Sequence, residues 1–272
     1  MSQNRLKVGL ALGSGSSRGL AHIGVLCVLE KEDIPIDLIA GTSAGAIVGA
    51  PYAFGFKAEG IKKTVNNFSL IEKARMIDIA LPKTGLISGN KIKNMLKSFI
   101  GDVEFKDLKV PFACVATDII SGTEVVLKEG SVVEAVRASI SIPGIFTVVK
   151  SNGRYLVDGG IVNPVPVSVC REMGADIVIA VNVMPPPHKM HNNTKKAPDI
   201  FHVIINTVDI ANAGLIKDSL EQADIIINPE TQDYKQTDFR HVGELIKKGE
   251  EATLEAIPRI KELLKLHHTR SG

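Results

Sequence analysis

The sequence predicts an α/β protein in which a mainly parallel central sheet lies between two layers of helices. Short apolar runs alternate with segments of helical periodicity along almost all of the 272 residues. Some runs, such as "IDLIAGT" and "ADIVIAVNV", are apolar at nearly every position, which is typical of strands covered on both faces. Regular alternation of strands and helices favours parallel strands, because neighbouring parallel strands need a long connection such as a helix.

The first half of the chain contains two predicted strand–helix units and a longer helical region. "LKVGLAL" is expected to form the first buried strand, and the apolar residues after it recur at helical spacing. "IDLIAGT" is the second expected strand, and a helix rich in small residues follows it. The predicted elements are a strand at 6–12, a helix from 20, a strand at 36–42, a helix from 43, and helices over 57–100 around a loop at 81–90.

The second half begins with a predicted β-hairpin, two β-rich runs joined by "ISG". The segment "MPPPHKMHNNTKKAP" (184–198) is poor in core-forming residues and is expected to be a mobile loop. No repeat or domain boundary is evident, so we expect one domain over 1–272. The predicted elements are strands at 110–119 and 123–130, a helix at 131–140, a strand at 153–160, a helix at 165–174, a strand at 175–183, a helix at 200–220, a strand at 223–230 and a helix to about 267.

The composition excludes several classes of function. With 32 basic and 30 acidic residues, the chain lacks the excess positive charge of a nucleic-acid-binding protein. Cys27, Cys114 and Cys170 are widely spaced, which favours buried reduced thiols over a zinc site or a disulfide framework. We expect no metal and no cofactor. No window holds the roughly twenty apolar residues of a membrane span, and the first apolar run is short for a signal peptide, so a cytoplasmic protein is expected.

The first candidate site is the glycine-rich loop "GSGSSRG" (Gly13 to Gly19), between the first strand and the first helix. Backbone amides at such a junction can bind a phosphate or the oxyanion of an acyl-transfer intermediate. A dinucleotide is the competing ligand, but Gly19 lies one residue too far along for G-x-G-x-x-G. The second strand also lacks the terminal acidic residue that binds a ribose. The loop alone leaves both ligands open.

The second candidate site is the pentapeptide from Gly41 to Gly45, a G-x-S-x-G pattern centred on Ser43. A strand before it and a helix after it form the setting in which this pattern holds a nucleophilic serine on a sharp turn. The glycines are needed because side chains at their positions would crowd the turn. A nucleophilic serine also requires a base to accept its proton.

The histidines are poor candidates for that base. None is expected at the end of a core strand, where the histidine of a catalytic triad would lie. The seven are His22, His188, His191, His202, His241, His267 and His268. The third candidate site, "YLVDGG", instead places Asp158 at the end of a strand, before Gly159 and Gly160. In isolation this motif would be an ordinary Asp-Gly turn.

Four stretches together resemble the patatin-like phospholipase family in their order and spacing: "LALGSGSSRGLAHIGVL", "GTSAGAIVGA", "RASISIPGIF" and "DGGIVNPVPV". The resemblance implies a patatin-like fold and a Ser–Asp dyad that works without histidine. Ser43 is then the nucleophile, and Asp158, 115 residues later, is the general base. The implied oxyanion hole lies in the loop formed by Gly13, Ser14, Gly15, Ser16, Ser17, Arg18 and Gly19.

Within that loop, the amides of Gly15 and Ser16 are the expected oxyanion donors. Arg18 matches the basic residue of the family and is expected either to orient the loop or to meet an acidic head group. Ser14 and Ser16 replace two glycines that are usual in the family. A positive φ at either serine would cost on the order of 1 kcal/mol.

The implied activity is hydrolysis of carboxylic esters in phospholipids, lysophospholipids or acylglycerols through an acyl-enzyme on Ser43. The expected partners are a lipid or acyl-ester substrate and, transiently, a membrane surface; nucleic acid is not expected. Two alternatives are a catalytically idle regulatory or lipid-binding protein of the same fold, and a nucleotide-binding α/β protein that uses the loop from Gly13 to Gly19.

Overall fold

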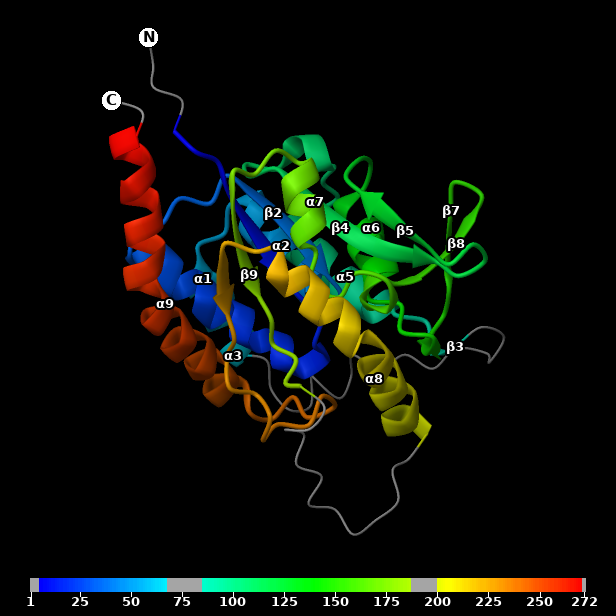
Figure 1. Cartoon of the computed structure of the whole chain (residues 1–272). Coiled ribbons are helices and arrows are strands. Elements are labelled where there is room, and N and C mark those ends of the chain that lie inside the picture. The colour runs from blue at the N-terminus through cyan, green and yellow to red at the C-terminus, as the bar shows by residue number, and fades with distance from the viewer. Residues whose placement is uncertain (1–4, 68–84, 187–199, 271–272) are drawn as a thin grey trace.

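The computed structural model describes residues 5–67, 85–186 and 200–270, and it has a large mixed sheet at its centre (Figure 1). Five neighbouring strands run parallel, in the order β10-β9-β1-β2-β4. The strands β8, β7 and β5 extend the sheet with antiparallel pairings. The bounds are β1 Val8–Leu12, β2 Leu38–Thr42, β4 Phe112–Asp118, β5 Thr123–Leu127, β7 Val149–Ser151, β8 Arg154–Asp158, β9 Ile177–Val181 and β10 Ile225–Ile227.

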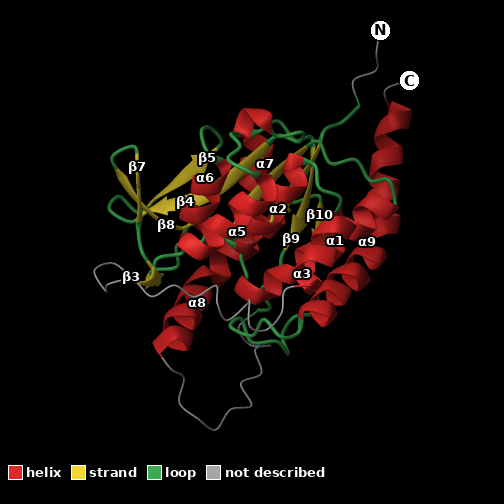
Figure 2. Ribbon diagram, turned by 180° about the vertical axis from the view of Figure 1, so that it is seen from behind, coloured by secondary structure: helices red, strands yellow, loops and turns green. Residues whose placement is uncertain are grey.

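Helices cover both faces of this sheet, as the sequence predicts. The side chains of Val8, Leu10 and Leu12 in β1 belong to one core cluster, whereas Ala11 belongs to the other, because successive residues of a strand point to opposite faces. Figure 1 shows α7 and α8 in front of the sheet, and Figure 2 shows the helices of the opposite layer. The helices in front of the sheet are α7 Val167–Glu172 and α8 Ile200–Glu221. The opposite layer contains η1 Ser16–Leu20, α1 Ala21–Lys31, α2 Ala44–Phe54, α3 Ala58–Asn67, α5 Asn90–Ile100, α6 Val132–Ser139 and α9 Val242–Arg270.

Three short strands were not predicted. Within the predicted loop at 81–90, β3 (Gly85–Ile87) pairs in parallel with β6 (Gly144–Phe146). The third is β7, which pairs with β8. Each has only three residues, too few for a two-residue periodicity to be recognised. Residues 68–84, where helix and then the start of the loop at 81–90 were expected, lie outside the described residues, and so do residues 187–199, which include most of the expected mobile loop.

The pairing of β4 determines where the ends of β2 and β8 meet. One edge of β4 is occupied by β5 from Cys114 to Asp118. The other edge therefore binds both β2, as far as the pair Val115–Thr42, and β8, from the pair Ala116–Asp158. Since β2 runs parallel to β4 and β8 runs antiparallel, their carboxyl ends face each other across consecutive residues of β4.

Within the described ranges, no helix combines the length and the apolar character needed to span a bilayer.

Candidate active site

Ser43 lies on the sharp turn between β2 and α2 and has an unusual backbone conformation. Its φ is 53° and its ψ is −115°, a region that costs a residue with a side chain about 1–3 kcal/mol. The Ser43 amide donates to the Ser139 hydroxyl oxygen at 2.9 Å. A side chain at Gly45 would overlap the backbone carbonyl of Leu12 in β1. The glycine thus lets α2 begin directly against the sheet, with Ser43 at its N-terminus.

Asp158 accepts a hydrogen bond from Ser43. The Ser43 hydroxyl donates to Asp158 Oδ2 at 2.6 Å, and the Gly160 amide donates to Asp158 Oδ1 at 2.7 Å. The Asp158 backbone is also fixed, because its carbonyl accepts from the Thr117 hydroxyl at 2.8 Å. Both carboxylate oxygens are therefore held in place, and one of them is aimed at the serine.

Burial strongly affects the ionisation of Asp158, whose side chain is only 6% exposed. Removal from water raises its pKa to about 6 from an ordinary value of 3.8, because the charged form loses its hydration. The hydrogen bonds from Ser43 and Gly160 oppose this increase, and the nearby charge of Asp209 adds to it. Asp158 is consequently ionised at neutral pH and a stronger base than an exposed aspartate.

The glycine-rich loop leaves two of its amides available. The Gly13 amide donates to the Val181 carbonyl at 3.0 Å and the Ser14 amide donates to the Pro164 carbonyl at 2.8 Å. The amides of Ser17 and Arg18 are also paired with backbone carbonyls. The amides of Gly15 and Ser16 have no acceptor among the residues that the structure describes, and both residues line the cleft that contains Ser43. The resemblance predicts these same two amides as oxyanion donors, and that role stays a prediction.

The glycine-rich loop has a strained conformation and is supported by a contact with the buried His22 ring. Ser16 has a φ of 50°, a positive value that costs a residue with a side chain on the order of 1 kcal/mol. A side chain at Gly15 would overlap Val183, so a glycine is needed there. The buried ring of His22 contacts the Gly13 carbonyl through Nε2 at 2.8 Å. Since burial lowers the pKa of His22 to about 4, the ring is neutral, and Nε2 carries the proton that it donates.

Arg18 points into the protein and does not line the cleft. Its Nε donates to the Tyr234 carbonyl at 2.9 Å. Next to it, the Ser17 hydroxyl donates to the Lys235 carbonyl at 3.0 Å, and the Ser17 amide donates to the Gln236 carbonyl at 3.1 Å. Of the two roles considered for Arg18, the structure supports orientation of the loop, because the guanidinium attaches it to residues 234–236.

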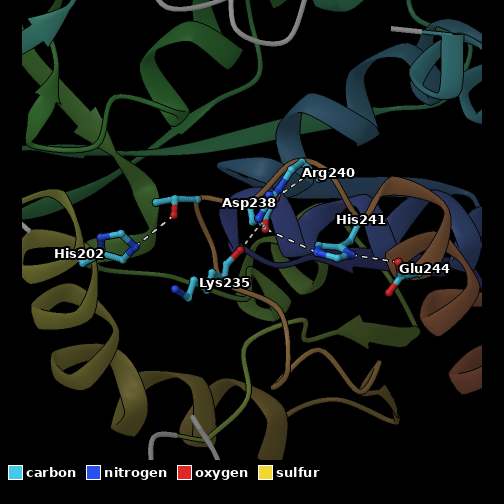
Figure 3. A network of polar contacts seen from close by, with 8 residues as sticks. His202, Lys235, Asp238, Arg240, His241 and Glu244 are labelled. Atoms are coloured by element: carbon cyan, nitrogen blue, oxygen red, sulfur yellow. Dashed lines mark hydrogen bonds and ion pairs between the residues drawn. The ribbon is translucent and has the colours of Figure 1, made fainter. Parts of the chain in front are cut away.

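Segment 234–236 is followed by a network of polar contacts at the start of α9 (Figure 3). His241 lies between Glu244, at 2.9 Å from Nδ1, and Asp238, at 3.5 Å from Nε2. Asp238 is also paired with Arg240, at 2.7 Å. None of the histidines with described side chains lines the cleft around Ser43. His188 and His191 lie outside the described residues.

The cleft beside Ser43 is small, about 50 Å³, and α8 covers one side of it. Asn212 of α8 donates to the Gly160 carbonyl, and Asp209 accepts a hydrogen bond from Gln236. Sequence reasoning missed both α8 residues. The signal for Asp209 was a single carboxylate within the apolar run "HVIINTVDIANAGLI". Burial raises the pKa of Asp209 to about 6 as well, although Gln236 and Arg18 oppose that effect.

Several known proteins are similar in sequence to this chain. An uncharacterized NTE family protein of Mycobacterium tuberculosis is 36% identical over 177 residues, which are 65% of this chain and 49% of that protein. Lysophospholipase NTE1 of Meyerozyma guilliermondii is 36% identical over 183 residues, 65% of this chain and 12% of that protein. Patatin-like phospholipase domain-containing protein 6 of Homo sapiens is 35% identical over 183 residues, again 65% of this chain but 13% of that protein. The chain thus matches half or less of the length of these relatives.

Two solved structures share the fold at low sequence identity. VipD from Legionella pneumophila superposes with a TM-score of 0.54 at 13% identity, covering 94% of this chain and 67% of that one. The type III effector protein ExoU superposes with a TM-score of 0.50, also at 13% identity, covering 93% of this chain and 53% of that one. Residues 10–171, which include the glycine-rich loop, Ser43 and Asp158, match the family model described as patatin-like phospholipase. The chain therefore belongs to the patatin-like phospholipase family.

Proposed function

We propose that this protein is a serine hydrolase that cleaves carboxylic esters of lipids, with Ser43 as nucleophile and Asp158 as general base. The observation that carries the proposal is the 2.6 Å hydrogen bond from the Ser43 hydroxyl to the buried Asp158 carboxylate, next to two available amides. Membership in a phospholipase family and similarity to a protein named lysophospholipase support a lipid ester as substrate.

In acylation, Ser43 Oγ attacks the ester carbonyl carbon while its proton moves to Asp158 Oδ2. The carbonyl oxygen gains negative charge, which the amides of Gly15 and Ser16 stabilise by donating hydrogen bonds. The tetrahedral intermediate collapses when the bond from carbon to the alcohol oxygen breaks, and Asp158 returns the proton to that oxygen. The products of this step are the alcohol and an acyl ester on Ser43.

In deacylation, water replaces the serine as nucleophile. Asp158 accepts a proton from the water, and the new oxyanion occupies the same pair of amides. When the bond between the acyl carbon and Ser43 Oγ breaks, Asp158 gives the proton to the serine and the carboxylic acid leaves. The raised pKa of Asp158 suits both directions of proton transfer, because it lies closer to neutral pH than that of an exposed aspartate.

Contact with a lipid surface is a second part of the proposal. α8 covers the cleft, and its exposed apolar residues are Ile200, Val203, Ile210 and Leu215. Because these side chains point outward, α8 could be the part of the protein that contacts a lipid interface, and the cleft would then lie close to that interface. This contact would be transient, since a few exposed side chains bury little apolar area.

Labelling of Ser43 with a fluorophosphonate tests the proposed function, because the probe reacts with an activated serine. We expect labelling of the wild type and of Ser121→Ala, a control at an exposed hydroxyl, and none of Ser43→Ala. Asp158→Asn should reduce hydrolysis of a short acyl ester by about 10³-fold or more. Absence of labelling in the wild type would favour the catalytically idle alternative. Stabilisation against heat by a nucleotide would favour the nucleotide-binding alternative.

A further inference from the structure

A second, larger cavity lies beside the catalytic cleft. It is a groove of about 570 Å³ between the second half of α8 and the chain that follows β9 and β10. In Figure 1, α8 lies in front of the sheet close to β9. Apolar side chains form most of the lining, among them Ala213, Ile216 and Leu220 of α8, Ile226 of β10, and Pro185 and Pro229.

The groove and the catalytic cleft share part of their walls. Met184 and Asp209 line both cavities. Gln236 joins these two residues, since its side-chain amide donates to Asp209 and approaches the Met184 sulfur at 3.6 Å. The boundary between the cavities is thus formed by side chains. One of them is a methionine, whose unbranched thioether adopts new rotamers easily.

The catalytic cleft itself is too small for an acyl chain. Its volume of about 50 Å³ is less than a tenth of the volume of the groove, about 570 Å³. Any chain longer than a few carbons must therefore extend beyond it. The groove has the volume typical of sites for small organic ligands, about 300–1,000 Å³.

We propose that this groove is the subsite for the acyl chain of the substrate, which enters it from Ser43 past the side chain of Met184. The assignment rests on the proposed function and deepens it. From Asp209 to Leu220, α8 advances by about 16 Å, which is the length of about thirteen bonds of an extended chain. The charged residues Lys217, Glu221 and Glu230 also line the groove. They are well exposed, and a chain that fills the groove would end among them.

A matched pair of variants on α8 tests the subsite. Ala213→Trp places a large side chain in the groove, whereas Ala211→Trp places the same side chain on the exposed face of the helix. For Ala213→Trp we expect kcat/KM on p-nitrophenyl dodecanoate to fall about 10-fold or more, with p-nitrophenyl acetate unchanged, because buried methylenes lose their contacts. For Ala211→Trp we expect both values to stay near the wild type. Ile226→Glu, a second change in the groove at a half-exposed position, should have the effect of Ala213→Trp.

Equal loss on both esters in Ala213→Trp and Ile226→Glu, or no loss on either ester, would overturn the subsite. Binding of a fluorescent dodecanoate analogue to Ser43→Ala protein gives a readout that needs no turnover. We expect Ala213→Trp to weaken this binding about 10-fold and Ala211→Trp to leave it unchanged. Equal binding of the analogue by the Ala213→Trp and Ala211→Trp proteins would also refute the assignment of the groove as the acyl-chain subsite. If the wild type is not labelled at Ser43 but binds the analogue in the groove, then the proposed function fails and the groove stands as a binding site for an acyl chain.

Discussion

Replacement of Asp158 by asparagine should make the folded protein more stable at neutral and higher pH. Asparagine has nearly the same shape and can still accept from the Gly160 amide, but it has no charge to desolvate. In the wild type, burial raises the pKa of Asp158 to about 6 from its ordinary value of 3.8. The charge at this position is therefore a cost to folding wherever the carboxyl is ionised.

The size and the sign of the effect follow from linkage. Each factor of ten between the two ionisation equilibria is worth about 1.4 kcal/mol, so the raised pKa corresponds to about 3 kcal/mol. Because the pKa is higher in the folded state, this stability is fully present below pH 3.8 and is lost as the pH rises through about 6. Between pH 4 and pH 8, the wild type should thus lose about 2 kcal/mol relative to Asp158→Asn.

Urea denaturation of both proteins across this pH range measures the difference directly. Other groups that titrate in the folded protein, such as His22, contribute to both proteins and cancel to a first approximation. Asp218→Asn, at an exposed position on α8, controls for the loss of one charge. A difference between wild type and Asp158→Asn that stays constant from pH 4 to pH 8 would refute the argument that burial raises this pKa.

Three further changes test other parts of the site. Asp209→Asn removes a negative charge that raises the pKa of Asp158, so the acid limb of the pH profile of kcat/KM for a short ester should move to lower pH. An acid limb that stays at the same pH or moves to higher pH would contradict this electrostatic coupling. Gly45→Ala should lower the free energy of unfolding by about 3 kcal/mol, because the new Cβ would overlap the Leu12 carbonyl. A urea midpoint near that of the wild type would contradict this, because it would mean that the backbone of the turn can move away from β1. Ser16→Gly should raise the free energy of unfolding by up to about 1 kcal/mol by relieving a φ of 50°, and should retain ester hydrolysis because the amide remains; a loss of stability would mean that the serine side chain supports the loop.

Much of the fold could be predicted from the sequence, because its main elements carry strong local patterns. The largely apolar runs form β1, β2, β4 and β9, and the glycines of the G-x-S-x-G pattern form the expected turn at Ser43. The contact between Ser43 and Asp158 could be inferred only from resemblance to a family. Physically it depends on β8 running antiparallel on the same edge of β4 as β2, and nothing local in "GRYLVDGG" specifies its partner or its direction.

The rest of the site depends on contacts between distant segments. Asp209, Asn212 and Gln236 come to the cleft from α8 and from the loop before α9, so their role follows from tertiary packing. The two roles considered for Arg18 could not be separated from its position in the sequence. The direction of its side chain is set by the carbonyl of Tyr234, 216 residues away.

Segment 234–236 has a consequence for how substrate preference can change in this protein. Its backbone carbonyls accept hydrogen bonds from Ser17 and Arg18 of the glycine-rich loop, and its Gln236 side chain donates to Asp209 of α8. The wall of the groove and the glycine-rich loop are thus both attached to residues 234–236. Under the proposed function, a shift of α8 that admits longer acyl chains would also disturb the loop proposed to stabilise the transition state, unless residues 234–236 are redesigned together with the helix.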